Sequence, residues 1–146
     1  MNLRIEKYGG SSVATPAKIQ HIAKSLVEKQ DQGDQLVVVV SAMGETTNRL
    51  INLACEISDH ASRREMDQLL VAGEQISIAM MTMAIEAAGG QAISLTGPQA
   101  GIYTNDQHGQ GRITHIDTKK VLDQLQDGKI VIVAGFQGLN SKGDIT

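Results

Sequence analysis

Three glycine-rich segments of the sequence have the composition of loops that bind phosphate groups. Each follows a strand candidate; they are residues 7–12 (KYGGSS), 41–44 (SAMG) and 135–138 (GFQG). Glycines let backbone N–H groups approach phosphate oxygens closely, and a helix that begins after such a loop adds favourable partial positive charge. Lys7 places a full positive charge directly beside the first pair of glycines. Together these residues predict a site that binds phosphoryl groups.

The first loop matches neither of two common nucleotide-binding fingerprints. A Walker loop requires G-x-x-x-x-G-K-[ST] and a dinucleotide fold requires G-x-G-x-x-G in its first turn, and neither is present. Taken alone, a lysine and two glycines after a strand also fit a tight turn with a solvated lysine. Three glycine-ended strands in one chain favour the phosphate-binding interpretation over that alternative.

Strand and helix signals alternate along the chain. They predict strands at residues 2–7, 36–40, 91–95, 112–116 and 130–134, and helices at 16–32, 47–58, 63–88 and 117–126. Gly73 is a candidate break in the third helix. The uniform β-branched run at 36–40 predicts a central strand covered on both faces. Strands separated by helices predict an α/β fold with a mainly parallel sheet, and ligands of such sheets bind at the carboxyl ends of the strands.

The composition excludes several classes of protein. The 146 residues are 41% apolar and 20% charged, with a net charge of -3, which is ordinary for a soluble domain and gives no basic surface for nucleic acid. Aromatic residues are too few for base stacking. The four histidines lack ligand-like spacing, so no fixed metal site is expected. Cys55 lies on an apolar helix face and is expected to be a buried structural thiol.

No membrane association is expected. The N-terminus lacks the basic start and apolar run of a signal peptide. The longest apolar stretch, residues 75–88, spans about 21 Å as a helix, whereas a bilayer core needs about 30 Å. We therefore expect a cytoplasmic protein. Residues 105–112, which include His108 and Arg112, are expected to form a mobile surface loop.

Five motifs, in order along nearly the whole chain, resemble the catalytic domain of aspartokinases, within the amino-acid kinase family. They are KYGGSSV at 7–13, VSAMG with TTNRL at 40–50, LLVAGEQIS at 69–77, LTGPQAGI at 95–102 and VAGFQG at 133–138. The first is close to the family signature Lys-Phe-Gly-Gly-Thr-Ser-Val, with Tyr8 and Ser11 as mild departures. The resemblance implies a three-layer, carbamate kinase-like sandwich with a mainly parallel central sheet.

The resemblance also implies an activity. Aspartokinases phosphorylate the β-carboxylate of L-aspartate with ATP, giving aspartyl phosphate in the first step of lysine, threonine and methionine biosynthesis. ATP would be bound together with Mg²⁺, and the full-length enzyme is expected to be an allosteric homo-oligomer. Two alternatives stay open. One is a kinase of the same fold that acts on another carboxylate or phosphate, such as N-acetylglutamate or a nucleoside monophosphate; the other is a non-catalytic binding module.

The site residues implied by the resemblance fall into two groups. Lys7, Tyr8, Gly9 and Gly10 would bind the phosphates of ATP, and Ser41, Thr47 and Glu74 would line the aspartate pocket. Lys7 would be catalytic because phosphoryl transfer depends on positioning and on neutralising charge. Glu74 would face the substrate ammonium, since an anionic partner discriminates an amino acid from a plain diacid.

Plainer interpretations of the second group also exist. Thr47 could be only the N-cap of the following helix, Ser41 could satisfy a strand-end amide, and Glu74 could lie on a helix surface. The arginine and aspartate of the family's Leu-Gly-Arg-Gly-Gly-Ser-Asp pattern do not occur within residues 1–146. These residues are therefore expected to be the N-terminal part of a catalytic domain, with the nucleotide-binding half and ACT regulatory domains downstream. By themselves they are expected to have no appreciable kinase activity.

Overall fold

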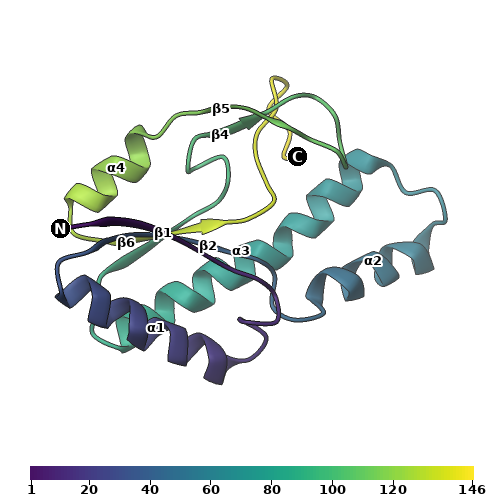
Figure 1. Ribbon diagram of the computed structural model, residues 1–146. Helices are drawn as coiled ribbons and strands as arrows, with labels where there is room; N and C mark the ends of the chain where they lie inside the picture. The colour runs from purple at the N-terminus through teal and green to yellow at the C-terminus, as the bar shows by residue number, and fades with distance from the viewer.

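A parallel β-sheet forms the centre of the computed structural model, which describes residues 1–146 (Figure 1). Its four strands lie in the order β1 (Leu3–Tyr8), β2 (Gln35–Val40), β6 (Ile130–Ala134) and β3 (Ala92–Leu95). Two further strands, β4 (Ile102–Thr104) and β5 (Ile113–Ile116), form a separate antiparallel ribbon. The helices are α1 (Pro16–Asp31), α2 (Thr46–Ile57), α3 (Arg63–Ala87) and α4 (Lys119–Gln126).

The sheet has a helical layer on each face. Helices α1 and α3 lie on one face, and α4 lies on the other together with the β4–β5 ribbon (Figure 1). The larger core joins α1 and α3 to β2 and β6, and the smaller one joins Leu125 of α4 to β6 and β3. The predicted α/β fold with a parallel central sheet is confirmed, and the only antiparallel pair among the named strands is the ribbon.

The predicted helices are present, and two of them begin beside a side chain that accepts a backbone amide hydrogen bond. The Thr15 hydroxyl accepts a hydrogen bond from the Lys18 amide, and Pro16 opens α1. Before α4, the Asp117 carboxylate accepts a hydrogen bond from the Lys119 amide at 3.0 Å. The expected break at Gly73 is wrong, because α3 continues through it without interruption. A Cβ at Gly73 would lie 2.9 Å from the Cβ of Ala42, so this glycine serves close packing instead.

Helix α3 is also longer than its apolar stretch suggested. Its 25 residues make it long and apolar enough to cross a membrane by length and composition. Its buried side chains, among them Ile78, Met81 and Ile85, pack in the larger core with α1 and the sheet. That core accounts for the buried apolar side chains of α3, whereas Ile76 and Met83 on the same helix are exposed.

One expectation about burial holds in part, and another is wrong. All five residues of β6 are buried, but β2 alternates, with Leu36, Val38 and Val40 buried and the residues between them half-exposed. The reason is that the smaller core is centred on β6 and β3 and extends only partly over β2. Cys55 is exposed, since α2 has no buried residue and packs mainly against α3.

Candidate active site

The three glycine-rich loops begin at the same edge of the sheet. Strand register pairs Tyr8 with Val40, and Val40 with Ala134, so β1, β2 and β6 end at one level. Hydrogen bonds join the loops: the Ser41 amide donates to the Tyr8 carbonyl at 3.1 Å, and the Gly135 amide donates to the Val40 carbonyl at 2.9 Å. The shared edge predicted from the sequence is confirmed.

The two glycines of the first loop have different surroundings. A Cβ at Gly10 would lie 2.8 Å from the Ala42 carbonyl oxygen and 3.2 Å from that of Gly44, so the first loop packs directly on the second. The Gly44 amide also donates to the Gly10 carbonyl at 2.9 Å. Gly9 has no atom within 4 Å of such a Cβ and is exposed. Gly10 thus holds the loop in place, while Gly9 leaves backbone open to a ligand.

Lys7 lies at this edge and has no carboxylate partner. Its side chain is exposed, and its Nζ atom lies 4.8 Å from the centre of the Phe136 ring, in the third loop. None of the ion pairs in the structure involves Lys7. The ammonium is therefore free to meet an anionic ligand.

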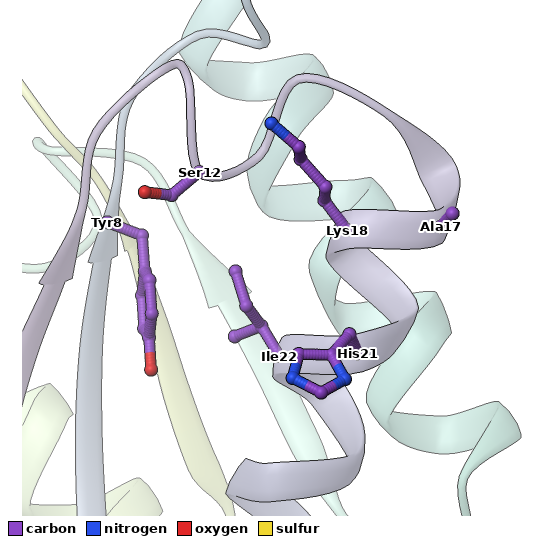
Figure 2. Close-up of a pocket in the computed structure, with 6 residues that line it drawn as sticks. All are labelled: Tyr8, Ser12, Ala17, Lys18, His21 and Ile22. Atoms are coloured by element: carbon purple, nitrogen blue, oxygen red, sulfur yellow. The ribbon is translucent and has the colours of Figure 1, made fainter.

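Tyr8 turns its side chain to the other face of the sheet, as strand alternation requires. Its hydroxyl donates to Glu6 at 2.6 Å, and Lys29 pairs with the same carboxylate at 2.5 Å. Burial, together with the bond to Glu6, raises the pKa of the Tyr8 hydroxyl. Figure 2 shows the ring lining a hollow of about 430 Å³ beside Ser12 and α1. Lys7 and Tyr8 thus do not act on the same side, and a phosphate contact by Tyr8 would involve its backbone.

Glu74 is buried beside the second loop. It lies on α3, its residue is 8% exposed, and its neighbour Gly73 packs against Ala42 and Thr46. Burial raises the pKa of the Glu74 carboxyl, and the backbone amides of Glu74 and Ala42 partly offset that rise. No ion pair involves Glu74. The alternative that Glu74 is a helix-surface residue is therefore wrong.

Ser41 and Thr47 lie on the same β2–α2 segment. Both are half-buried, and neither hydroxyl has a hydrogen-bond partner among those of the structure. The N-cap of α2 is Glu45, so Thr47 lies inside the first turn and the N-cap alternative is wrong. The Thr46 hydroxyl, by contrast, donates to the Met43 carbonyl at 2.6 Å. Ser41 and Thr47 thus keep free hydroxyls on the loop against which α3 packs at Gly73.

The comparison with known families decides where this arrangement belongs. Residues 2–146 match the Amino acid kinase family. The chain belongs to that family. It is 51% identical over all 146 residues to an aspartokinase from Geobacillus stearothermophilus, and equally so to aspartokinase 2 of Bacillus subtilis. Each alignment covers 100% of this chain and 36% of the relative, so the chain spans about a third of the length of these relatives.

Solved structures agree on the fold. An aspartate kinase from Synechocystis superposes with a TM-score of 0.83 at 39% identity, covering 100% of this chain and 23% of that one. Escherichia coli aspartokinase III, solved with aspartate and ADP, gives a TM-score of 0.81 at 19% identity, covering 100% and 43%. Because aspartokinase III is only 19% identical to this amino acid kinase chain, that match supports the fold and nothing further.

Sequence reasoning did not single out two residues that the structure places beside the candidate site. Phe136 has a backbone φ of 56°, the one positive value outside glycine, and is 79% exposed. Gln137 is buried, and its side-chain oxygen accepts a hydrogen bond from the Gly97 amide at 3.0 Å, which ties the loop after β3 to the loop after β6. The sequence showed the motif GFQG, but no pattern in it indicates which way these side chains turn.

The surface loop at residues 105–112 is anchored to α3. The His108 ring nitrogen Nδ1 lies 2.8 Å from an Asp67 carboxylate oxygen, and the Gly109 amide donates to the same carboxylate at 3.1 Å. The His108 side chain is 17% exposed. This loop is thus not the free loop that its composition suggested. The chain holds no group of three His, Cys, Asp or Glu side chains that could bind a metal ion.

Proposed function

We propose that these residues form the N-terminal part of the catalytic domain of an aspartokinase, which transfers phosphate from ATP to the β-carboxylate of L-aspartate. The observation that carries the proposal is the burial of the unpaired Glu74 carboxylate against the loop next to Lys7 and its glycines. One edge of the sheet thus offers a cation for phosphate and an anion for an ammonium. The identity of about half to aspartokinases over the whole chain supports the same activity.

In this proposal the first loop holds the phosphoryl group. Lys7 neutralises the charge on the transferring group, and the amides of Gly9 and Gly10 donate to its oxygens, with Tyr8 contributing backbone from the same loop. The reaction needs little else from this part of the protein, because phosphoryl transfer is catalysed by positioning and electrostatic stabilisation. The substrate carboxylate supplies the nucleophilic oxygen, so no strong general base is required.

The second loop and α3 hold the amino acid. Glu74 receives the substrate ammonium, and the free hydroxyls of Ser41 and Thr47 donate hydrogen bonds to its polar groups. A buried carboxylate without a cation is costly, so an arriving ammonium gains a strong, desolvated partner. N-acetylglutamate has no ammonium, and this difference favours a free amino acid over that alternative substrate.

The remaining parts of the proposal concern the longer protein. The nucleotide-binding half and the ACT regulatory domains would lie beyond Thr146, and the complete enzyme would be a cytoplasmic homo-oligomer. ATP would enter with Mg²⁺, but residues 1–146 hold no acidic cluster that fits the ion. No step is therefore assigned to Mg²⁺ on these residues.

The experiment that tests the proposal compares acceptor substrates. The complete gene product that carries this sequence is given ATP with aspartate, N-acetylglutamate or a nucleoside monophosphate, and acyl phosphate is trapped with hydroxylamine while ADP release is followed. Aspartyl hydroxamate should form with aspartate alone. Turnover of N-acetylglutamate or of the nucleotide in preference to aspartate would support another kinase of this fold, and no turnover of any acceptor would support a binding module.

A further inference from the structure

Phe136 has a backbone conformation that a bulky residue rarely adopts. Its φ of 56° places it in the left-handed region, and every other positive φ in the chain belongs to a glycine. Side chains larger than that of Asn are seldom found there, because Cβ approaches the backbone too closely. Such conformations persist where the surroundings impose them, and they gather at functional sites.

The neighbours of Phe136 are fixed on both sides. Gly135 donates its amide to the Val40 carbonyl at 2.9 Å, and a Cβ there would lie 3.1 Å from the same oxygen. On the other side, the Gln137 side chain accepts the Gly97 amide, and a Cβ at Gly97 would lie 2.2 Å from the Gln137 carbonyl oxygen. The chain therefore turns at Phe136 between two residues that are tied to distant segments.

The Phe136 side chain at this turn adds nothing to the hydrophobic core. Phe136 is 79% exposed, whereas Gly135 and Gln137 are buried on either side of it. An aromatic ring in water at the edge of a sheet gains little from the hydrophobic effect. The ties on either side impose the strained backbone, and its consequence is that the ring points out of the core.

The ring meets the ammonium of Lys7. The Nζ atom lies 4.8 Å from the ring centre, within the range of a cation–π interaction. A lysine ammonium has three N–H donors, and contact with a ring face leaves some of these donors available for a ligand. A free lysine side chain loses considerable rotamer entropy when it is fixed by a ligand, and a ring that holds it beforehand reduces that loss.

We propose that Phe136 is a positioning residue for Lys7: its ring holds the ammonium at the glycine loop before the phosphate arrives. The inference rests on the proposed role of Lys7 in phosphate binding. It assigns to the exposed, strained Phe136 a task that acts entirely through the lysine.

The contact itself can be tested without any substrate. Protons above an aromatic ring shift upfield, so the ε-methylene protons of Lys7 should be shifted in the NMR spectrum of the protein, with the assignment taken from their loss in Lys7→Arg. Phe136→Leu should return them to the ordinary lysine position, whereas Phe136→Tyr and Phe136→Trp should keep the shift. An unshifted Lys7 signal in the unmodified protein would overturn the inference.

Its consequence can be tested by nucleotide binding to the complete gene product. Phe136→Leu keeps an apolar side chain in the same strained backbone and should weaken ATP binding by about two- to five-fold, the range of an exposed cation–π contact. Phe136→Tyr should restore the affinity. In a Lys7→Ala background, Phe136→Leu should have no further effect, because the ring then has no cation to place.

A loss of affinity of the same size in both backgrounds would mean a merely structural role, and it would overturn the inference, as would unchanged binding in Phe136→Leu. These outcomes are separate from the proposed function. If aspartate is not phosphorylated but the Lys7-dependent effect on ATP is present, the substrate assignment fails and the role of Phe136 stands. If aspartate is phosphorylated and the effect is absent, the reverse holds.

Discussion

The two charged groups of the candidate site are held in opposite ways. Lys7 is the residue before the last of the edge strand β1; it is exposed, and its ammonium contacts the Phe136 ring. Glu74 lies inside the longest helix, is 8% exposed, and sits where Gly73 lets α3 approach the second loop closely. The proposed phosphate side is therefore open to solvent, whereas the proposed amino-acid side is built into the packing of the fold.

The difference follows from what each group must do. A lysine in water costs little to keep charged, and it can follow a phosphoryl group as the group moves between donor and acceptor. A buried carboxylate is costly to keep charged, but it discriminates strongly, because a ligand without an ammonium leaves it unpaired. Rate should thus depend mainly on Lys7, and selectivity mainly on Glu74.

The largest effect on turnover is expected when the positive charge of Lys7 is removed. Lys7→Ala in the complete gene product is expected to lower kcat by about 100- to 1000-fold, the usual result of removing one group that stabilises transition-state charge. Lys18→Ala is the matched control, since that exposed lysine donates to the Ser11 carbonyl and is not proposed to bind phosphate; it should leave kcat unchanged. Steady-state ADP release measures both. Unchanged turnover in Lys7→Ala would support the non-catalytic alternative.

Removal of the buried charge of Glu74 should mainly weaken the binding of aspartate. Glu74→Gln keeps the shape but loses the ionic partner of the ammonium, so kcat/KM for aspartate should fall by roughly ten- to a hundred-fold, mainly through KM. Glu86→Gln, which changes an exposed acid on the same helix, should leave both constants unchanged. An equal fall in kcat without a change in KM would place Glu74 in the chemistry instead of the pocket.

The sequence predicted the frame of the site more completely than its details. Alternating strands and helices gave the parallel sheet, and the glycine-rich strand ends gave the shared edge, because both depend on local pattern. The opposite facing of Lys7 and Tyr8 could also have been predicted, since successive side chains of a strand point to opposite faces.

Other features depend on contacts between distant segments. Gly73 was expected to break the helix because the sequence alone does not distinguish a glycine that ends a helix from one that allows close packing of a loop against the helix. Cys55 was expected to be buried because α2 has an apolar face. The sequence does not show that α2 packs mainly against α3 and leaves Cys55 exposed. The positive φ of Phe136 is imposed by ties to Val40 and Gly97, which lie far away in the sequence.

The packing of the phosphate side can be tested by its two glycines. Gly10→Ala should lower the free energy of unfolding by about 1–3 kcal/mol, as overpacking does, because its Cβ would lie 2.8 Å from the Ala42 carbonyl oxygen. Gly9→Ala should change it little, since no atom lies within 4 Å. Urea unfolding measures both. Equal destabilisation by the two substitutions would show that the first loop does not rest on the second as described.

The smallest expected effect concerns the stability cost of Glu74. Burial raises the pKa of its carboxyl above the ordinary value of 4.5, so its ionisation opposes folding at neutral pH. The cost is full above the folded pKa and disappears below the unfolded one, where the group is protonated in both states. Glu74→Gln should therefore be more stable than the unmodified protein at pH 7, and the difference should shrink as the pH falls through the raised pKa of the folded state and vanish below about 4.5.

Urea unfolding at several pH values checks this, with Glu86→Gln as the control that should show no such trend. The lowered pKa values of Glu6 and Asp144 are common to both proteins and cancel in the difference. Aspartate should stabilise the unmodified protein more than Glu74→Gln, because only the carboxylate gains an ammonium. A stability difference that does not change with pH would mean that Glu74 is not an ionised, buried group, and the contrast with Lys7 would then rest on packing alone.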